Sequence, residues 1–159
     1  MKQCTQSGKA CTECPFSRNS TSGNLGGSPI EVYLGQILGA FYLPCHMAKN
    51  YKGNDTPLLA EHMQCAGAAI FRRHIGIADR IPDPLLKLDT DDGNVFTNLA
   101  EFIQHHDPEL PEAMVKRMVS LANRGYYTQL EMMRAMITGK DFKTSEQAVA
   151  DYKKGGSDD

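Results

Sequence analysis

The chain of 159 residues lacks tryptophan, long apolar runs and a strong net charge, and each absence narrows what the protein can be. Its core has to be filled by other large side chains, of which eight Met, six Phe and six Tyr are present. No apolar run is long enough to cross a bilayer, and none follows Met1 as a signal peptide requires. We therefore expect a globular cytoplasmic protein with no membrane partner, in a compartment where thiols stay reduced.

The length predicts one domain over residues 1–159. We divide it into a metal-site half at 1–75, a helical half at 76–155 and a short tail at 156–159. The net charge of −2 is unevenly distributed, because residues 1–80 carry eight Lys and Arg against five Asp and Glu. This imbalance weakly favours contact of the first half with a polyanion, and the alternative is an ordinary solvated surface.

Four of the five cysteines form a spaced pattern. Cys11 and Cys14 make a C-x-x-C knuckle in C-T-E-C-P-F, and Cys45 in L-P-C-H and Cys65 in Q-C-A-G-A-A follow at longer intervals. Clustered cysteines in a reducing compartment bind metal or do chemistry more often than they form structural disulfides. The sequence therefore predicts a tetrahedral thiolate site formed by Cys11, Cys14, Cys45 and Cys65.

The cysteine pattern favours an iron–sulfur cluster of the 4Fe-4S type and keeps zinc as the alternative. Pro15 directly follows the second knuckle cysteine, as is common at cluster ligands. Small or apolar neighbours such as Pro44 and Gly67 exclude water and allow a bulky group to approach. Structural zinc sites more often use two knuckles, and this chain has one. A third reading is that Cys45 and Cys65 are buried small hydrophobic residues without a metal.

Two histidines and the remaining cysteine lie near this pattern in the sequence. His46 adjoins Cys45 and can replace one ligand or support the site from outside the coordination shell. His62 precedes Cys65 by three residues, the spacing of neighbours on a helix, and is a candidate of the same kind. Cys4 lies in a polar segment before the knuckle, and we expect it to be a spare thiol.

The rest of the pattern is helical, and no run of residues supports a sheet. Ser28 with Glu31, and Thr128 with Glu131, have the spacing of capping boxes. We predict a mainly α single helical domain whose N-terminal loop segment is held by the four-cysteine metal site. The expected helices run from Ser28-Pro29 to about Gly39, from Thr56-Pro57 to about Arg73, over Asn98–His105, over Pro111–Asn123, from Thr128 to Gly139, and from Thr144 or Ser145 to the C-terminal glycines.

Two further features bear on binding partners. Arg72 and Arg73 end the predicted Cys65 helix, where they can form a basic rim for a nucleic acid or an acidic protein patch; the alternative is a solvated helix end. Methionines recur at helical spacing in the second half of the chain. The simplest interpretation is that they are core residues. The more specific alternative is that they line a Met-rich groove that binds a partner. The methionines are Met114, Met118, Met132, Met133 and Met136.

The combination of C-x-x-C-P-F-S-R, P-C-H and C-A-G-A-A-I-F-R, over residues 11–73, resembles a pattern in small phage and bacterial proteins. The resemblance implies a shared metal-type site and brings no settled activity. We therefore expect a small, phage-encoded metalloprotein that regulates a host protein or binds another macromolecule without catalysis. The alternative is a nucleic-acid-processing or redox enzyme that uses the cluster or an activated cysteine.

Overall fold

The computed structural model describes residues 9–39, 43, 45, 65–77 and 93–139, and this part of the chain is mainly helical, as predicted. Its only β pairing is an isolated antiparallel bridge between Ser17 and Val95. The described residues form five helices: α2 (Ile30–Leu38), α3 (Ala66–His74), α4 (Leu99–His106), α5 (Glu112–Asn123) and α6 (Tyr127–Thr138).

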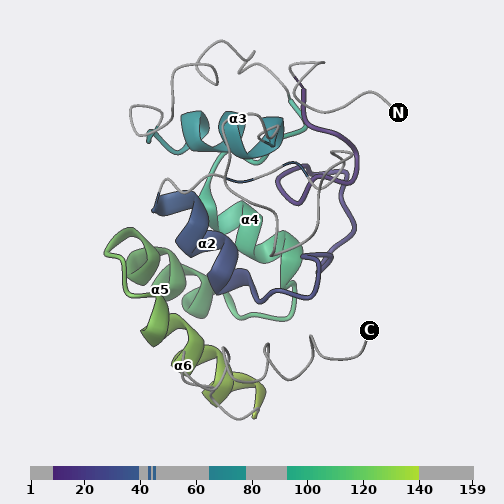
Figure 1. Cartoon of the computed structure of the whole chain (residues 1–159). Helices are drawn as coiled ribbons and strands as arrows, with labels where there is room; N and C mark the ends of the chain where they lie inside the picture. The colour runs from purple at the N-terminus through teal and green to yellow at the C-terminus, as the bar shows by residue number, and fades with distance from the viewer. Residues whose placement is uncertain (1–8, 40–42, 44, 46–64, 78–92, 140–159) are drawn as a thin grey trace, which may run out of the picture.

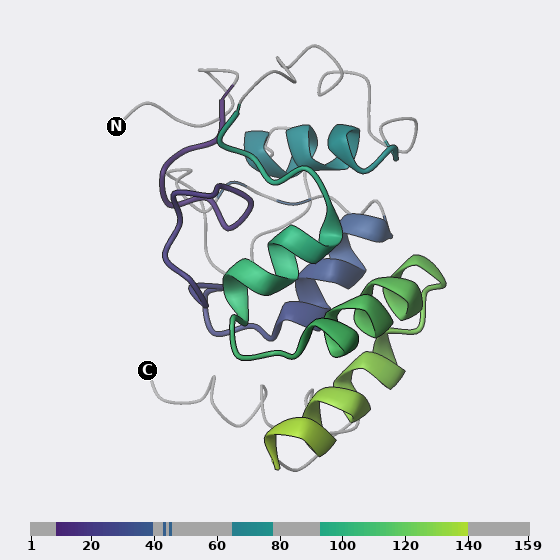
Figure 2. The same ribbon diagram turned by 180° about the vertical axis from the view of Figure 1, so that it is seen from behind.

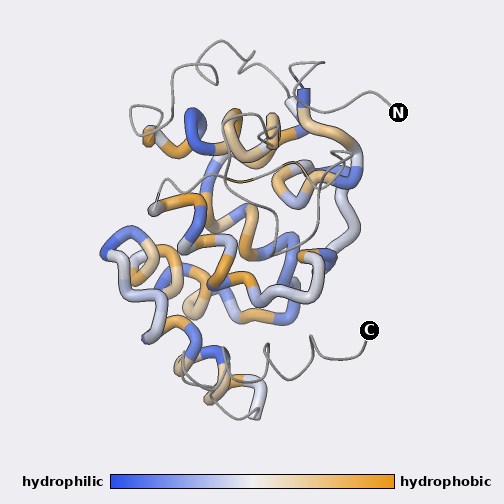
Figure 3. Tube along the Cα trace, viewed as in Figure 1, coloured by the Kyte–Doolittle hydropathy of each residue, from blue (hydrophilic) through white to orange (hydrophobic). Residues whose placement is uncertain are grey.

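The helices are stacked from α3 at one end of the molecule to α6 at the other, with α2, α4 and α5 between them (Figure 1). Helix α2 contacts α3, α5 and α6, and α4 and α6 each contact α5. The loop before α2 runs along one edge, from the level of α3 to the start of α2 (Figure 2). Hydrophilic and hydrophobic stretches alternate along α5 and α6 (Figure 3), so each helix can bury one side against its neighbours. None of the described helices has the length and apolar character needed to span a membrane.

Phe16, two residues after the knuckle, fills the centre of the core. Its ring stacks on Phe71 of α3 at 5.5 Å between centroids and on Phe102 of α4 at 5.4 Å. The Phe16 carbonyl accepts a hydrogen bond from Phe96 N (3.1 Å), which continues the bridge between the two loops. The N-terminal loop is therefore attached to the helices by its own apolar contacts as well as by its cysteines.

Two predicted capping boxes are wrong. Helix α2 begins at Ile30 with Pro29 in the capping position and no side-chain cap, so Ser28 does not cap it. Glu31 is instead buried, and its carboxylate faces Arg134 of α6 at 3.5 Å. Helix α6 likewise begins without a side-chain cap, so the box at Thr128 does not form.

Other boundaries agree with the sequence pattern. Helix α5 covers Glu112–Asn123 against the prediction of Pro111–Asn123. Helix α6 ends where predicted, at Gly139, whose φ of 66° is a left-handed conformation that suits glycine. Helix α4 begins after Asn98, whose side chain accepts a hydrogen bond from the backbone N–H of Glu101.

Helix α3 differs from its prediction at its start. Cys65 has an extended backbone (φ −67°, ψ 117°) and precedes the helix, which begins at Ala66. A continuous helix through Cys65 is therefore wrong. The predicted beginning at Thr56-Pro57, and the last predicted helix at Thr144 or Ser145, lie outside the described residues.

Candidate metal centre

The knuckle is a tight turn with its second thiol in the interior. Cys14 N donates a hydrogen bond to the carbonyl of Cys11 (3.1 Å), and the carbonyl of Cys14 accepts one from Ser17 N (2.9 Å). The Cys14 side chain is completely buried, whereas that of Cys11 is half-buried. Because the ring of Phe16 is anchored in the core, the turn holds the Cys14 thiol on the side of the loop that faces the protein interior.

Cys14 meets Cys65 at the start of α3. Their sulfur atoms lie 3.3 Å apart, although the residues are separated by 51 positions. The contact depends on Gly67, because a Cβ atom there would lie 2.3 Å from the Cys14 sulfur. The small residues around Gly67 predicted that another group can approach this part of the chain closely. In the structure that group is the Cys14 thiol.

Cys45 lies on a segment that pairs with Cys65. The backbone N–H of Cys65 donates to the carbonyl of Leu43 (2.8 Å), and the Cys45 side chain, two residues further along, is fully buried. Within the described residues, no group of three or more His, Cys, Asp or Glu side chains has the arrangement of a metal site. The complete four-cysteine site therefore stays a prediction.

The protonation of Cys14 reflects its thiol neighbours. Hydrogen bonds with the thiols of Cys11 and then Cys65, followed by burial, raise the pKa of Cys14 well above its ordinary value. A buried thiol of this kind stays protonated until a cation replaces the proton. A protonated Cys14 is a poor nucleophile, since the thiolate is the reactive species.

Three residues considered near the predicted site lie outside the described part of the chain. They are His46, His62 and Cys4. Their roles as a substitute ligand, a supporting residue and a spare thiol stay predictions.

Arg72 does not lie on a basic rim. Its side chain is 1% exposed, and it donates from Nε to the Ile37 carbonyl (3.2 Å) and from Nη2 to the Gln36 carbonyl (3.0 Å). These carbonyls lie in the last turn of α2, so the guanidinium caps the C-terminal end of that helix. Arg73 is half-buried at the end of α3, and its role in partner binding stays a prediction.

Sequence reasoning missed the residues that fasten the knuckle loop to α4. His106 donates from Nε2 to the carbonyl of Pro15 (2.6 Å) and accepts at Nδ1 from Gly23 N (3.2 Å). Arg18 forms a two-pronged ion pair with Glu101 and donates to the Gly93 carbonyl (2.6 Å). The only local signals were two adjacent histidines and one arginine. Such residues do not indicate which partner, more than 70 positions away in the sequence, they will contact.

The separation of the Cys14 and Cys65 sulfurs can be compared with what a metal requires. Two sulfurs that each lie 2.3 Å from one tetrahedral zinc ion are about 3.8 Å apart. Moving these sulfurs apart by roughly half an ångström would therefore accommodate a single ion between them. Comparisons with known proteins add no assignment, because the chain matches no protein-family model, no curated protein and no solved structure.

Proposed function

We propose that the chain is a small metal-binding protein in which a thiolate centre fixes the N-terminal loop to α3, and whose role is to bind a macromolecular partner. The ligands are Cys11, Cys14, Cys45 and Cys65. The observation that carries the proposal is the 3.3 Å contact between the Cys14 and Cys65 sulfurs. Two buried thiols from distant segments meet there at a glycine that leaves room for them.

The geometry favours a single zinc ion over the iron–sulfur cluster that the sequence favours. A cubane cluster places iron and sulfide atoms between its cysteine ligands, so their sulfurs lie further apart than two ligands of one ion. The Cys14 sulfur instead occupies the space against Gly67, with Ala10 also close to that position. Zinc is therefore the expected metal, and the experiment below distinguishes it from an iron–sulfur cluster.

A structural role for the metal is supported by the burial of its ligands. Cys14 and Cys45 are fully buried and Cys65 is 5% exposed, so three of the four thiols have almost no solvent contact. Catalytic zinc sites keep one position open to water or substrate, whereas structural sites are closed by four protein ligands. These points favour the binding protein over the redox or nucleic-acid-processing enzyme.

The test is the metal content and absorption spectrum of protein purified without oxygen, for the wild type and for Cys14→Ser. The expected result is a colourless protein with about one zinc per chain, which Cys14→Ser loses. A brown protein that absorbs at roughly 400 nm would show that the bound group is an iron–sulfur cluster and not zinc. Cys4→Ser is the matched control, because it removes a thiol outside the proposed ligand set and should retain the metal.

A further inference from the structure

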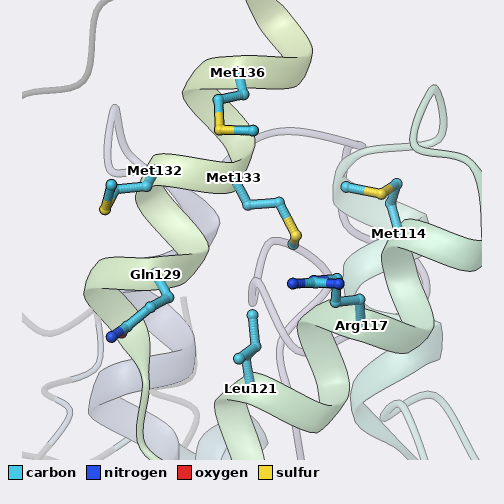
Figure 4. Close-up of a pocket in the computed structure, with 7 residues that line it drawn as sticks. All are labelled: Met114, Arg117, Leu121, Gln129, Met132, Met133 and Met136. Carbon is cyan, nitrogen blue, oxygen red and sulfur yellow. The ribbon is translucent and has the colours of Figure 1, made fainter.

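A methionine-lined cavity lies between α5 and α6 (Figure 4), and α6 is at the end of the molecule opposite α3 (Figure 1). Its volume is about 470 Å³. Met136 and Met132 on its rim are 80% and 47% exposed, whereas Met133 at its base is 9% exposed. The lining residues are Met114, Arg117, Leu121, Gln129, Met132, Met133 and Met136.

Only part of the predicted methionine stripe is core. Met118 is completely buried, but Met136 is the most exposed of the large apolar side chains in the described residues. Methionine side chains are unbranched and polarizable, and they adapt to varied apolar partners, which is why they are frequent at protein-binding grooves. Two of the described methionines, Met132 and Met136, are exposed on α6, and exposing such side chains is costly in water unless another molecule covers them.

Arg117 contributes a positive charge to this cavity, which we call the α5–α6 groove. It comes from α5, and its guanidinium points between the Met133 side chain and Leu121 (Figure 4). It forms no ion pair with any described residue, in contrast to Lys116 beside it, which pairs with Glu112 at 2.8 Å. Among the described residues, no acidic side chain lines the cavity. Arg117 is an exposed cation at the edge of a surface of thioethers, one leucine and one amide, and this combination is complementary to an apolar surface that carries one carboxylate.

We propose that the α5–α6 groove binds an amphipathic helix of a partner protein, which places apolar side chains against the methionines and an Asp or Glu beside Arg117. Helices dock into such grooves through anchors at i, i+3 or i+4, and i+7. The bidentate geometry of a guanidinium selects a carboxylate at one position of that helix. The inference rests on the partner-binding part of the proposed function and does not require the metal centre.

The test is selection from a displayed library of 16-residue amphipathic helices, with apolar residues varied at the anchor positions and Glu, Gln and Lys varied beside them. Against the wild-type protein we expect enrichment of Glu at one position. The selected peptide should bind roughly fivefold or more tightly than its Gln counterpart in fluorescence anisotropy, because a charge-assisted hydrogen bond is lost. Arg117→Gln should abolish this difference, whereas Arg124→Gln, whose guanidinium lies 4.7 Å from the Tyr126 ring, should keep it.

The location is tested with exposed residues whose replacement leaves the core unchanged. Met136→Gln should weaken the selected peptide at least about fivefold, and Val32→Gln on α2, an exposed apolar residue that does not line the cavity, should not. Absence of any enriched peptide, or equal enrichment of Glu and Lys, overturns the proposal. So does a protein that self-associates through Met136, or one in which decanoate displaces the peptide at one equivalent. If anaerobically purified protein contains no metal and still binds the peptide, the missing metal refutes the thiolate centre, and the peptide binding still supports this groove.

Discussion

Gly67 of α3 and Cys14 of the knuckle lie in a contact that only glycine permits, because a Cβ atom on Gly67 would come within 2.3 Å of the Cys14 sulfur. Neither neighbour is free to move far. Cys14 is fully buried and held by the anchored ring of Phe16, and Gly67 lies in the first turn of α3. The contact therefore joins the N-terminal loop to the helix that carries Cys65 at its start.

The first prediction is that Gly67→Ala destabilises the protein by about 1–3 kcal/mol, as overpacking of a filled core does. It should also lower the metal content, because the Cys14 thiol has to leave its position. Gly35→Ala in α2 is the matched control. A Cβ atom there would lie at an ordinary 3.7 Å from Tyr127, so the helix should gain slightly in stability. Urea unfolding measures the stability of both variants. An equal effect of the two substitutions on the free energy of unfolding would contradict the close contact.

The second prediction concerns the buried Arg72. Arg72→Met should destabilise the protein by about 2–4 kcal/mol, because the Gln36 and Ile37 carbonyls lose charged donors in the interior. Arg73→Met, one residue further along α3 and more exposed, should cost clearly less. Similar unfolding free energies for the two variants would mean that Arg72 acts as an ordinary helix-end charge.

His106 gives the third prediction, which concerns pH. Its two hydrogen bonds, from Nε2 to Pro15 and to Nδ1 from Gly23, require the neutral ring, and burial lowers its pKa, with a smaller contribution from His105. A folded-state pKa below the unfolded value of about 6.5 means that unfolding takes up a proton at acidic pH. The stability that His106 contributes should therefore be complete above pH ~6.5 and decrease as the pH falls through the folded-state pKa.

The pH effect is isolated by comparing the wild type with His106→Gln in urea unfolding between pH ~7.5 and ~5. The difference between the two curves should be largest at neutral pH and shrink towards acid. An NMR titration of the His106 ring gives the folded-state pKa directly. A difference that stays constant with pH, or a ring that titrates above the ordinary histidine value, would contradict the neutral bridging role.

The fourth prediction concerns the buried carboxylate of Glu31. Its oxygens accept no hydrogen bond from any described residue, and burial raises its pKa, although the charge of Arg134 opposes this in part. Arg134 also pairs with Asp107 at 2.9 Å. Arg134→Met should cost about 0.5–3 kcal/mol more in the wild type than in a Glu31→Gln background, because only the wild type is left with a buried, uncompensated charge. Equal costs in a double-mutant cycle would show that Arg134 acts through Asp107 alone.

The predictions from sequence succeeded where local rules decide the structure. The apolar spacing of Met114, Val115 and Met118 indicated α5, and Gly139 indicated the end of α6. Local rules failed at Glu31 and Arg72, which have the sequence context of a capping residue and a helix-end charge. Both are buried because of partners on other helices, which periodicity does not report. The pairing of Cys14 with Cys65 was expected from their chemistry, whereas the loop anchors at His106 and Phe16 depend on contacts that no motif records.

The most direct test of the central claim is native mass spectrometry of anaerobically purified protein, with elemental analysis of the same sample. The wild type and Cys4→Ser should carry about one zinc per chain, and Cys14→Ser and Cys65→Ser should lose it, because each removes one of four ligands. Resistance to protease should fall in the two metal-free variants around the knuckle, while α5 and α6 stay folded. A wild-type protein without any bound metal, or full metal content in both Cys14→Ser and Cys65→Ser, would contradict the thiolate centre.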